Sequence, residues 1–119
     1  ADFVSVNVAL TEDTRGLLDA AALARMKPDA ILVNTARGGI VDEDALADAL
    51  DAGRLGGAAL DVFSEEPLPA AHRLLSTRGV TVAPHIGSAT VATRSRMADL
   101  AVDNLLAGLR GDPLPRRGG

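Results

Sequence analysis

The chain has no cysteine, tryptophan or tyrosine, and Phe3 and Phe63 are its only aromatic side chains. Without cysteine it can form no disulfide, no thiolate metal site and no cysteine nucleophile. No apolar run approaches the roughly 18 residues of a transmembrane helix, and the first ten residues lack the features of a signal peptide. We therefore expect a cytoplasmic protein without a membrane partner, whose core consists of alanine, valine, leucine and isoleucine.

The chain also has fewer basic than acidic residues, and its formal net charge is −4 at pH 7. A nucleic-acid-binding face needs a clustered basic surface, and Arg116 and Arg117 form only a short basic tail. We therefore expect no nucleic-acid partner. With 119 residues, 47% of them hydrophobic and 24% charged, the chain has the size and composition of one ordinary globular domain.

Apolar segments of strand character alternate with segments of helical character. We expect strands within residues 2–10, 29–35, 57–63 and 79–84, and helices over residues 20–26, 43–50 and 89–109. Asp19 and Asp42 are suited to cap the first two helices, while Pro28 and Gly53 are suited to end them. Strands that alternate with helices predict an α/β fold with a parallel sheet and helices on its faces.

In such sheets ligands bind at the carboxyl ends of the strands. The segments that follow the four strands carry the polar residues Thr11, Arg37, Glu65, Glu66 and His85. A guanidinium matches a carboxylate with two parallel hydrogen bonds, and an imidazole transfers protons near neutral pH. A neighbouring carboxylate favours the imidazolium and orients its ring. Together these groups could hold an α-oxo acid and protonate its ketone while a hydride arrives.

Taken singly, each residue has a simpler interpretation. Arg37 could be a surface ion-pair partner, the two glutamates a solvated turn, His85 a packed loop residue, and Asp61 a backbone anchor. Their joint placement at strand ends, beside glycine or proline, is what favours a site.

Several other polar residues receive a structural interpretation. His72 has no partner of this kind in the sequence, so we expect it to be structural. The acidic residues 42–44 are expected to cap a helix and complement its N-terminus.

Three long motifs carry a family resemblance. They are "MKPDAILVNTARGGIVDEDAL" at 26–46, "GAALDVFSEEPLP" at 57–69 and "VAPHIGSAT" at 82–90. They resemble the D-isomer-specific 2-hydroxyacid dehydrogenases over nearly the whole chain, and "PLPAAHRLL" and "NLLAGLRGDPLP" resemble the glyoxylate/hydroxypyruvate reductases among them. The resemblance implies a Rossmann-like doubly wound sheet, NAD or NADP as cofactor, a small 2-oxo or 2-hydroxy acid as substrate, and a homodimer when full-length.

The resemblance also implies catalytic roles for three residues. Arg37 would bind the substrate carboxylate and polarise the oxo group, and His85 would donate a proton to the ketone. Glu66 would pair with His85 and raise its pKa, with Glu65 as the alternative for that position.

Further residues would contact the cofactor, and no metal site is implied. Asp61 would hold the nicotinamide carboxamide, and Thr11 matches a position that contacts the cofactor. The other residues expected near the nicotinamide or its ribose are Thr35, Ala36, Arg37, His85, Gly87 and Ser88.

The family's G-x-G-x-x-G phosphate loop does not occur in these 119 residues. By resemblance, residues 1–88 form the second half of an NAD(P)-binding domain, residues 89–110 a long helix returning towards a substrate domain, and residues 111–119 a flexible tail. We expect the chain alone to bind dinucleotide weakly. A dinucleotide-sensing or protein-binding scaffold of the same fold, and a half-domain without activity, are the alternatives to a dehydrogenase.

Overall fold

The computed structural model describes residues 1–116. Within them, the strands are β1 (Phe3–Val6), β2 (Ile31–Asn34), β3 (Gly57–Leu60) and β4 (Val80–Val82). The helices are α1 (Ala20–Leu23), α2 (Glu43–Asp51) and α3 (Val91–Arg110), with a short 3-10 helix, η1 (Arg73–Leu75). The chain divides into two compact units, Ala1–Ile86 and a second that begins at Gly87, and each is described by itself.

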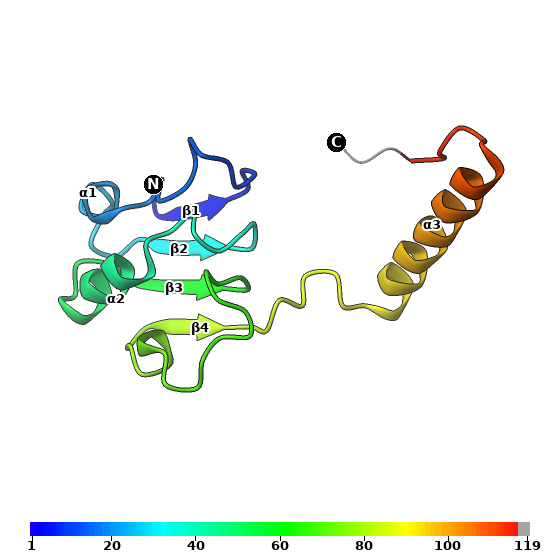
Figure 1. The fold of residues 1–119 in the computed structure, drawn as a ribbon. Coiled ribbons are helices and arrows are strands. Elements are labelled where there is room, and N and C mark those ends of the chain that lie inside the picture. Colours follow the sequence, from blue (N-terminus) through cyan, green and yellow to red (C-terminus); the bar gives the residue numbers. More distant parts are fainter. Residues whose placement is uncertain (117–119) are drawn as a thin grey trace. The chain divides into compact units, whose positions relative to one another are not determined.

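The four strands form one parallel sheet in the order β1-β2-β3-β4 (Figure 1). In this register Val6, Asn34, Leu60 and Val82 lie in one row across the sheet. The predicted α/β fold with a parallel sheet is therefore confirmed. Because all strands run the same way, the segments after Val6, Asn34, Leu60 and Val82 begin at one edge, which we call the carboxyl edge.

The expected helix starts are also observed. The Asp19 side chain accepts a hydrogen bond from the Ala22 N–H at 2.8 Å, and the Asp42 side chain accepts one from the Ala45 N–H at 3.0 Å. The helix expected over residues 20–26 is shorter, since α1 ends at Leu23 and residues 24–26 form turns. Helix η1 was not predicted from the sequence.

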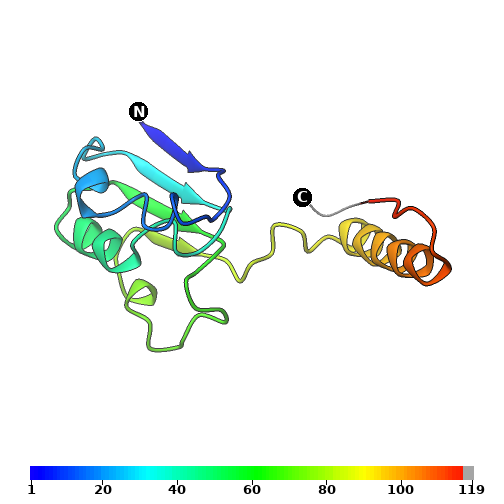
Figure 2. The same ribbon diagram turned by 45° about the horizontal axis from the view of Figure 1, so that its top comes forward.

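The core of the first unit lies on one face of the sheet. Val6, Leu32 and Leu60 are buried in one cluster with Leu23 of α1 and Leu46 of α2, and both helices lie on the same side of the strands (Figure 2). The opposite face carries Phe3 and Ile31, which are 71% and 37% exposed. Strand β1 is an edge strand of this sheet.

The second unit is built around α3. Thr90 begins this helix by accepting a hydrogen bond from the Thr93 N–H at 3.2 Å, and Gly111 ends it with a φ of 74°. Its apolar residues Met97, Leu105 and Leu109 are exposed. Among the described helices, none has the length and apolar character needed to cross a membrane.

Candidate active site

The loop after β2 is folded by a buried asparagine. The Asn34 Oδ1 accepts a hydrogen bond from the Ala36 N–H at 3.1 Å, and the Asn34 Nδ2 donates to the Arg37 carbonyl at 3.0 Å. These two bonds fold the backbone of residues 34–37 into a tight turn at the carboxyl edge. Asn34 was not predicted to have this role. Its position as a polar residue at the end of an apolar strand was the feature of the sequence that could have indicated it.

Arg37 projects from this turn into solvent. Its side chain is exposed, and its Nη1 donates to the carbonyl of Ala36 at 2.7 Å. Thr35, Ala36 and Arg37 line a cavity of about 640 Å³ together with residues 7–10, which follow β1. The turn after β2 and the segment after β1 thus border an open hollow of ligand size at the carboxyl edge.

Thr11 follows the cavity-lining segment but is not itself part of the lining. Its N–H donates to the Thr14 Oγ1 at 2.8 Å, and its carbonyl accepts from the Arg15 N–H at 3.0 Å. The structure therefore places Thr11 in a polar turn next to the cavity.

Gly38 joins the β2 turn to the loop after β3. A Cβ atom at position 38 would lie 1.9 Å from both the carbonyl carbon and the oxygen of Phe63. No side chain fits at that separation, so the close approach of the two backbones requires glycine. The contact sets the distance between the turn that carries Arg37 and the loop that carries Glu66.

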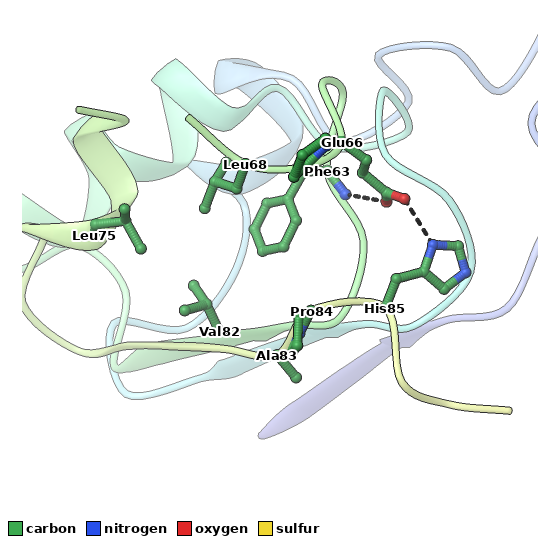
Figure 3. A pocket seen from close by; sticks show the side chains of 9 residues that line it. Phe63, Glu66, Leu68, Leu75, Val82, Ala83, Pro84 and His85 are labelled. Atoms are coloured by element: carbon green, nitrogen blue, oxygen red, sulfur yellow. Dashed lines mark hydrogen bonds and ion pairs between the residues drawn. The ribbon is translucent and has the colours of Figure 1, made fainter. Parts of the chain in front are cut away.

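Glu66 and His85 meet across the carboxyl edge (Figure 3). The Oε2 atom of Glu66 lies 2.7 Å from the Nδ1 atom of His85, and its Oε1 accepts a hydrogen bond from the Phe63 N–H at 3.0 Å. The residue against His85 is thus Glu66 and not the adjacent Glu65. The carboxylate is held at both oxygens, which fixes its plane towards the imidazole.

The same contacts stabilise the ionised form of Glu66. The hydrogen bond with His85 contributes most to holding the pKa of Glu66 below its ordinary value, followed by the hydrogen bond from the Phe63 backbone. The charges of His85 and Arg37 lower this pKa further, while partial burial opposes them. The charge of Arg37 contributes least to this lowering, and it acts on Glu66 without a direct hydrogen bond.

The backbone at His85 adopts an unusual conformation. Its φ is 54°, and among the described non-glycine residues it is the one with a positive φ. Asp61, which is 7% exposed, accepts a hydrogen bond from the following N–H of Ile86 at 2.8 Å. Left-handed backbone costs free energy for residues other than glycine and persists where the surroundings enforce it. Asp61 and Glu66 together enforce it at His85.

An apolar cavity of about 290 Å³ adjoins the Glu66–His85 pair. Figure 3 shows the pair at one end of this cavity. The apolar residues of its lining are Phe63, Pro67, Leu68, Leu75, Val82, Ala83 and Pro84. One side of the ion pair is therefore apolar, and the other side is open to solvent.

The expectation that His72 lacks a carboxylate partner was wrong. Its Nε2 lies 3.3 Å from the Oε2 of Glu43, and its Nδ1 accepts a hydrogen bond from the Leu74 N–H at 3.3 Å as η1 begins. Glu43 also accepts hydrogen bonds from the N–H and the Oγ of Ser64, at 2.7 and 2.9 Å. The fold brings these residues together although they lie far apart in the sequence, which is why the sequence pattern did not reveal the contact.

The remaining expected site residues lie outside the first unit. Gly87 and Ser88 belong to the unit that begins at Gly87, so their contact with a cofactor stays a prediction. Within residues 1–116, no group of three histidine, aspartate or glutamate side chains is placed to hold a metal ion.

Comparison with known proteins identifies related sequences and folds. Residues 1–87 match the model of the family described as "D-isomer specific 2-hydroxyacid dehydrogenase, NAD binding domain". The chain is 52% identical over 112 residues to the glyoxylate/hydroxypyruvate reductase B of Pectobacterium carotovorum subsp. carotovorum, covering 94% of this chain and 35% of that protein. The chain spans about a third of the length of the curated relatives it matches.

Solved structures agree with the sequence matches. The TT0316 protein from Thermus thermophilus superposes with a TM-score of 0.92 at 51% identity, over 98% of this chain and 37% of that one. A D-isomer specific 2-hydroxyacid dehydrogenase from Xanthobacter autotrophicus Py2, in complex with NADPH and MES, superposes with a TM-score of 0.78 at 38% identity, over 100% and 48% of the two chains.

Proposed function

The chain belongs to the D-isomer specific 2-hydroxyacid dehydrogenase family, and from this premise we propose that it supplies the catalytic groups of an NAD(P)-dependent reductase. The substrate is a small 2-oxo acid, glyoxylate or hydroxypyruvate, which is reduced to the 2-hydroxy acid. Support for this substrate class comes from the reductases to which the chain is about half identical. The observation that carries the proposal is the Glu66–His85 pair beside Arg37.

The residues at the carboxyl edge fit the nicotinamide end of the cofactor. The cavity of about 640 Å³ combines apolar side chains in its lining, Val8, Ala9, Leu10 and Ala36, which suit a flat ring, with a larger polar surface. Thr35 and Arg37 line the same cavity. Of the residues outside the lining, we assign Thr11, Asp61, His85, Gly87 and Ser88 to the same end of the cofactor. The bound coenzyme supplies the hydride that reduces the carbonyl carbon.

Arg37 binds the substrate in this proposal. A guanidinium donates two parallel hydrogen bonds to a carboxylate, which fixes both the position and the orientation of the oxo acid. Arg37 is exposed and adjoins the cavity, and in the free chain its Nη1 rests on the carbonyl of Ala36. A substrate carboxylate replaces that single hydrogen bond to a neutral carbonyl with two parallel hydrogen bonds between opposite charges.

His85 moves the proton. Its Nδ1 is occupied by Glu66, so its Nε2 is the nitrogen that donates a proton to the ketone oxygen. The ionised Glu66 stabilises the imidazolium before transfer and orients the ring throughout. In the reverse direction the neutral Nε2 accepts the hydroxyl proton. Each reduction consumes one hydride at carbon and one proton at oxygen, which balances the conversion of a 2-oxo acid to a 2-hydroxy acid.

Two attributes of the whole protein rest on the sequence alone, the first on its composition and the second on the family resemblance. A cytoplasmic location and a homodimeric assembly are part of the proposal, and neither is needed for the chemistry of residues 37, 66 and 85.

The test uses the polypeptide encoded by the complete reading frame that contains these residues, called the full-length polypeptide below. We expect it to reduce glyoxylate and hydroxypyruvate with NADH or NADPH. Because Arg37 holds the substrate carboxylate, R37A should lower kcat/KM about 100-fold, mostly through KM, as expected for the loss of charge-assisted hydrogen bonds. Arg54 is another exposed arginine, whose side chain donates to the Asp48 carbonyl at 3.5 Å, and R54A serves as the matched control. Equal kcat/KM values for R37A and R54A would refute the assignment.

A further inference from the structure

The loop that carries Glu66 is tied to the start of α2 by a second glutamate, Glu43. The carboxylate of Glu43 accepts hydrogen bonds from the N–H of Ser64 at 2.7 Å and from its hydroxyl at 2.9 Å. Glu43 is the first residue of α2, directly after the capping residue Asp42. A helix that is packed into the core therefore holds the loop two residues before Glu66.

The two carboxylates bind successive amides of the same loop. The N–H of Phe63 donates to Glu66 at 3.0 Å, and the N–H of Ser64 donates to Glu43 at 2.7 Å. These two amides flank the Cα of Phe63, so the direction of one N–H constrains the direction of the other through two backbone dihedrals. Glu43 thus acts on the donor that fixes the Glu66 carboxylate against His85.

Other contacts make this arrangement stiff. The Glu43 side chain is 11% exposed, and its second oxygen lies 3.3 Å from the Nε2 of His72. Gly38 presses against the carbonyl of Phe63 from the β2 turn, and the Phe63 side chain is buried. The peptide between Phe63 and Ser64 is therefore held on several sides, and Glu43 supplies the one charged acceptor for its N–H.

We propose that Glu43 is a positioning residue for the reaction, which orients the Phe63–Ser64 backbone so that Glu66 is held in place against His85. The catalytic part of this inference rests on the proposed function. The effect of Glu43 on the position of Glu66 can be measured separately, by the titration of the Glu66 carboxyl, without an activity assay. Glu43 contacts neither the cavity at the ends of β1 and β2 nor the Glu66–His85 pair.

The charged groups around this network are few. From the segment before η1, His72 faces Glu43, and the neighbouring Arg73 pairs instead with Asp48 and Asp51 of α2. On the Glu66 side, Arg37 and His85 supply the positive charge. We therefore expect a substitution of Glu43 to affect Glu66 through the orientation of the Phe63–Ser64 backbone. The test is designed to detect this effect.

The test compares E43D, E43Q and D44A in the full-length polypeptide. E43D keeps the negative charge at the start of α2 but shortens the side chain, so it loses the reach to Ser64. E43Q keeps a side-chain oxygen at the original length and should preserve the hydrogen bond from the Ser64 N–H. Asp44 is the adjacent acidic residue in the first turn of α2, and D44A controls for the loss of a charge at the helix N-terminus.

The first measurement is the titration of the Glu66 carboxyl by NMR with ¹³C-labelled glutamate, the signal being assigned by its loss in E66Q. Because the Phe63 N–H lowers the pKa of Glu66, E43D should raise that pKa towards its ordinary value, while E43Q and D44A should leave it unchanged. The second measurement is turnover, for which E43D should lower kcat about tenfold with little change in KM.

The outcomes separate this inference from the proposed function. If E43D moves the Glu66 titration but the wild-type polypeptide reduces neither oxo acid, the coupling stands and the proposed reaction fails. If E43D is folded, by its amide spectrum, and titrates at Glu66 like D44A, the inference is overturned whatever the activity. A variant that only weakened the fold would shift the unfolding midpoint without moving the Glu66 titration, and this result would also overturn it.

Discussion

The Nδ1 atom of His85 lies 2.7 Å from the Oε2 atom of Glu66, across 19 residues of sequence. An ionised carboxylate accepts hydrogen bonds and cannot donate one, so the contact places a proton on Nδ1 and leaves Nε2 for the substrate. Both partners are partly exposed, with 45% of the His85 side chain and 36% of the Glu66 side chain accessible. The pair is thus fixed by protein contacts and remains open to a ligand.

Acid should remove the stabilisation that this pair gives to the fold. The pKa of Glu66 is lowered in the folded chain, chiefly by the hydrogen bond with His85. Its contribution is therefore fully present above the unfolded value of about 4.3 and is lost as the pH falls through the lowered, folded pKa. We expect wild type to be more stable than E66Q at pH 6 and the two to converge at low pH.

Urea unfolding of the full-length polypeptide across this pH range measures the difference. The exposed neighbour Glu65 offers the control, since E65Q removes the same charge without touching His85. A gap between wild type and E66Q that stays constant down to pH 3, or an E65Q variant with the same pH dependence, would contradict the assignment of the pair.

Asp61 should be needed to hold the segment that carries His85. D61A removes the acceptor of the Ile86 N–H, and the loss of a hydrogen bond to a charged group costs about 1.5–3 kcal/mol of unfolding free energy. D61N keeps an oxygen acceptor and should lose less. The check is the denaturant midpoint of both variants, and an order in which D61N is the less stable of the two would argue against the anchoring role.

Gly38 should tolerate no side chain. A Cβ atom at this position would overlap the backbone of Phe63. Overpacking of this kind typically lowers the free energy of unfolding by about 1–3 kcal/mol, and sometimes by more. Gly53 has a φ of 63° with open space around its Cβ position, so G53A should cost only about 1 kcal/mol from backbone strain. Thermal unfolding of G38A and G53A gives the comparison. Equal shifts in Tm would show that the turn after β2 can move away from the loop after β3 at no cost, which would contradict the requirement for glycine at position 38.

The sequence predicted those parts of the fold that depend on local patterns. The four strands, the caps Asp19 and Asp42 and the parallel arrangement follow from apolar runs and capping residues close to them in the chain. Helix α1 ended early because the hydrogen bonds of Arg25 and Met26 are of the tighter i to i−3 type, and because Pro28 disfavours helix in the residue before it. That competition between helix and turn cannot be resolved from composition.

Apart from the Glu66–His85 pair, which the family resemblance implied and the structure confirms, contacts between distant loops could not be predicted from the sequence. The choice between Glu65 and Glu66 depends on which side chain the turn directs towards His85, and adjacent residues in a loop point in different directions. Glu43 of α2 contacts Ser64 and His72 of the segment between β3 and η1, about 20 to 30 residues further along the chain, so no spacing rule reveals these contacts. The close approach of Gly38 to the backbone of Phe63 likewise joins two loops that are distant in the sequence.

The central claim is that His85 donates the proton to the substrate ketone, and H85Q in the full-length polypeptide tests it most directly. We expect H85Q to lower kcat for glyoxylate and hydroxypyruvate reduction by about 10²–10⁴-fold, the usual contribution of a positioned general acid, while NADH or NADPH binding changes little. R54A, which removes an exposed side chain outside the candidate active site, serves as the control. Turnover of H85Q within a few-fold of wild type would show that the proton comes from elsewhere, and the proposed mechanism would be wrong.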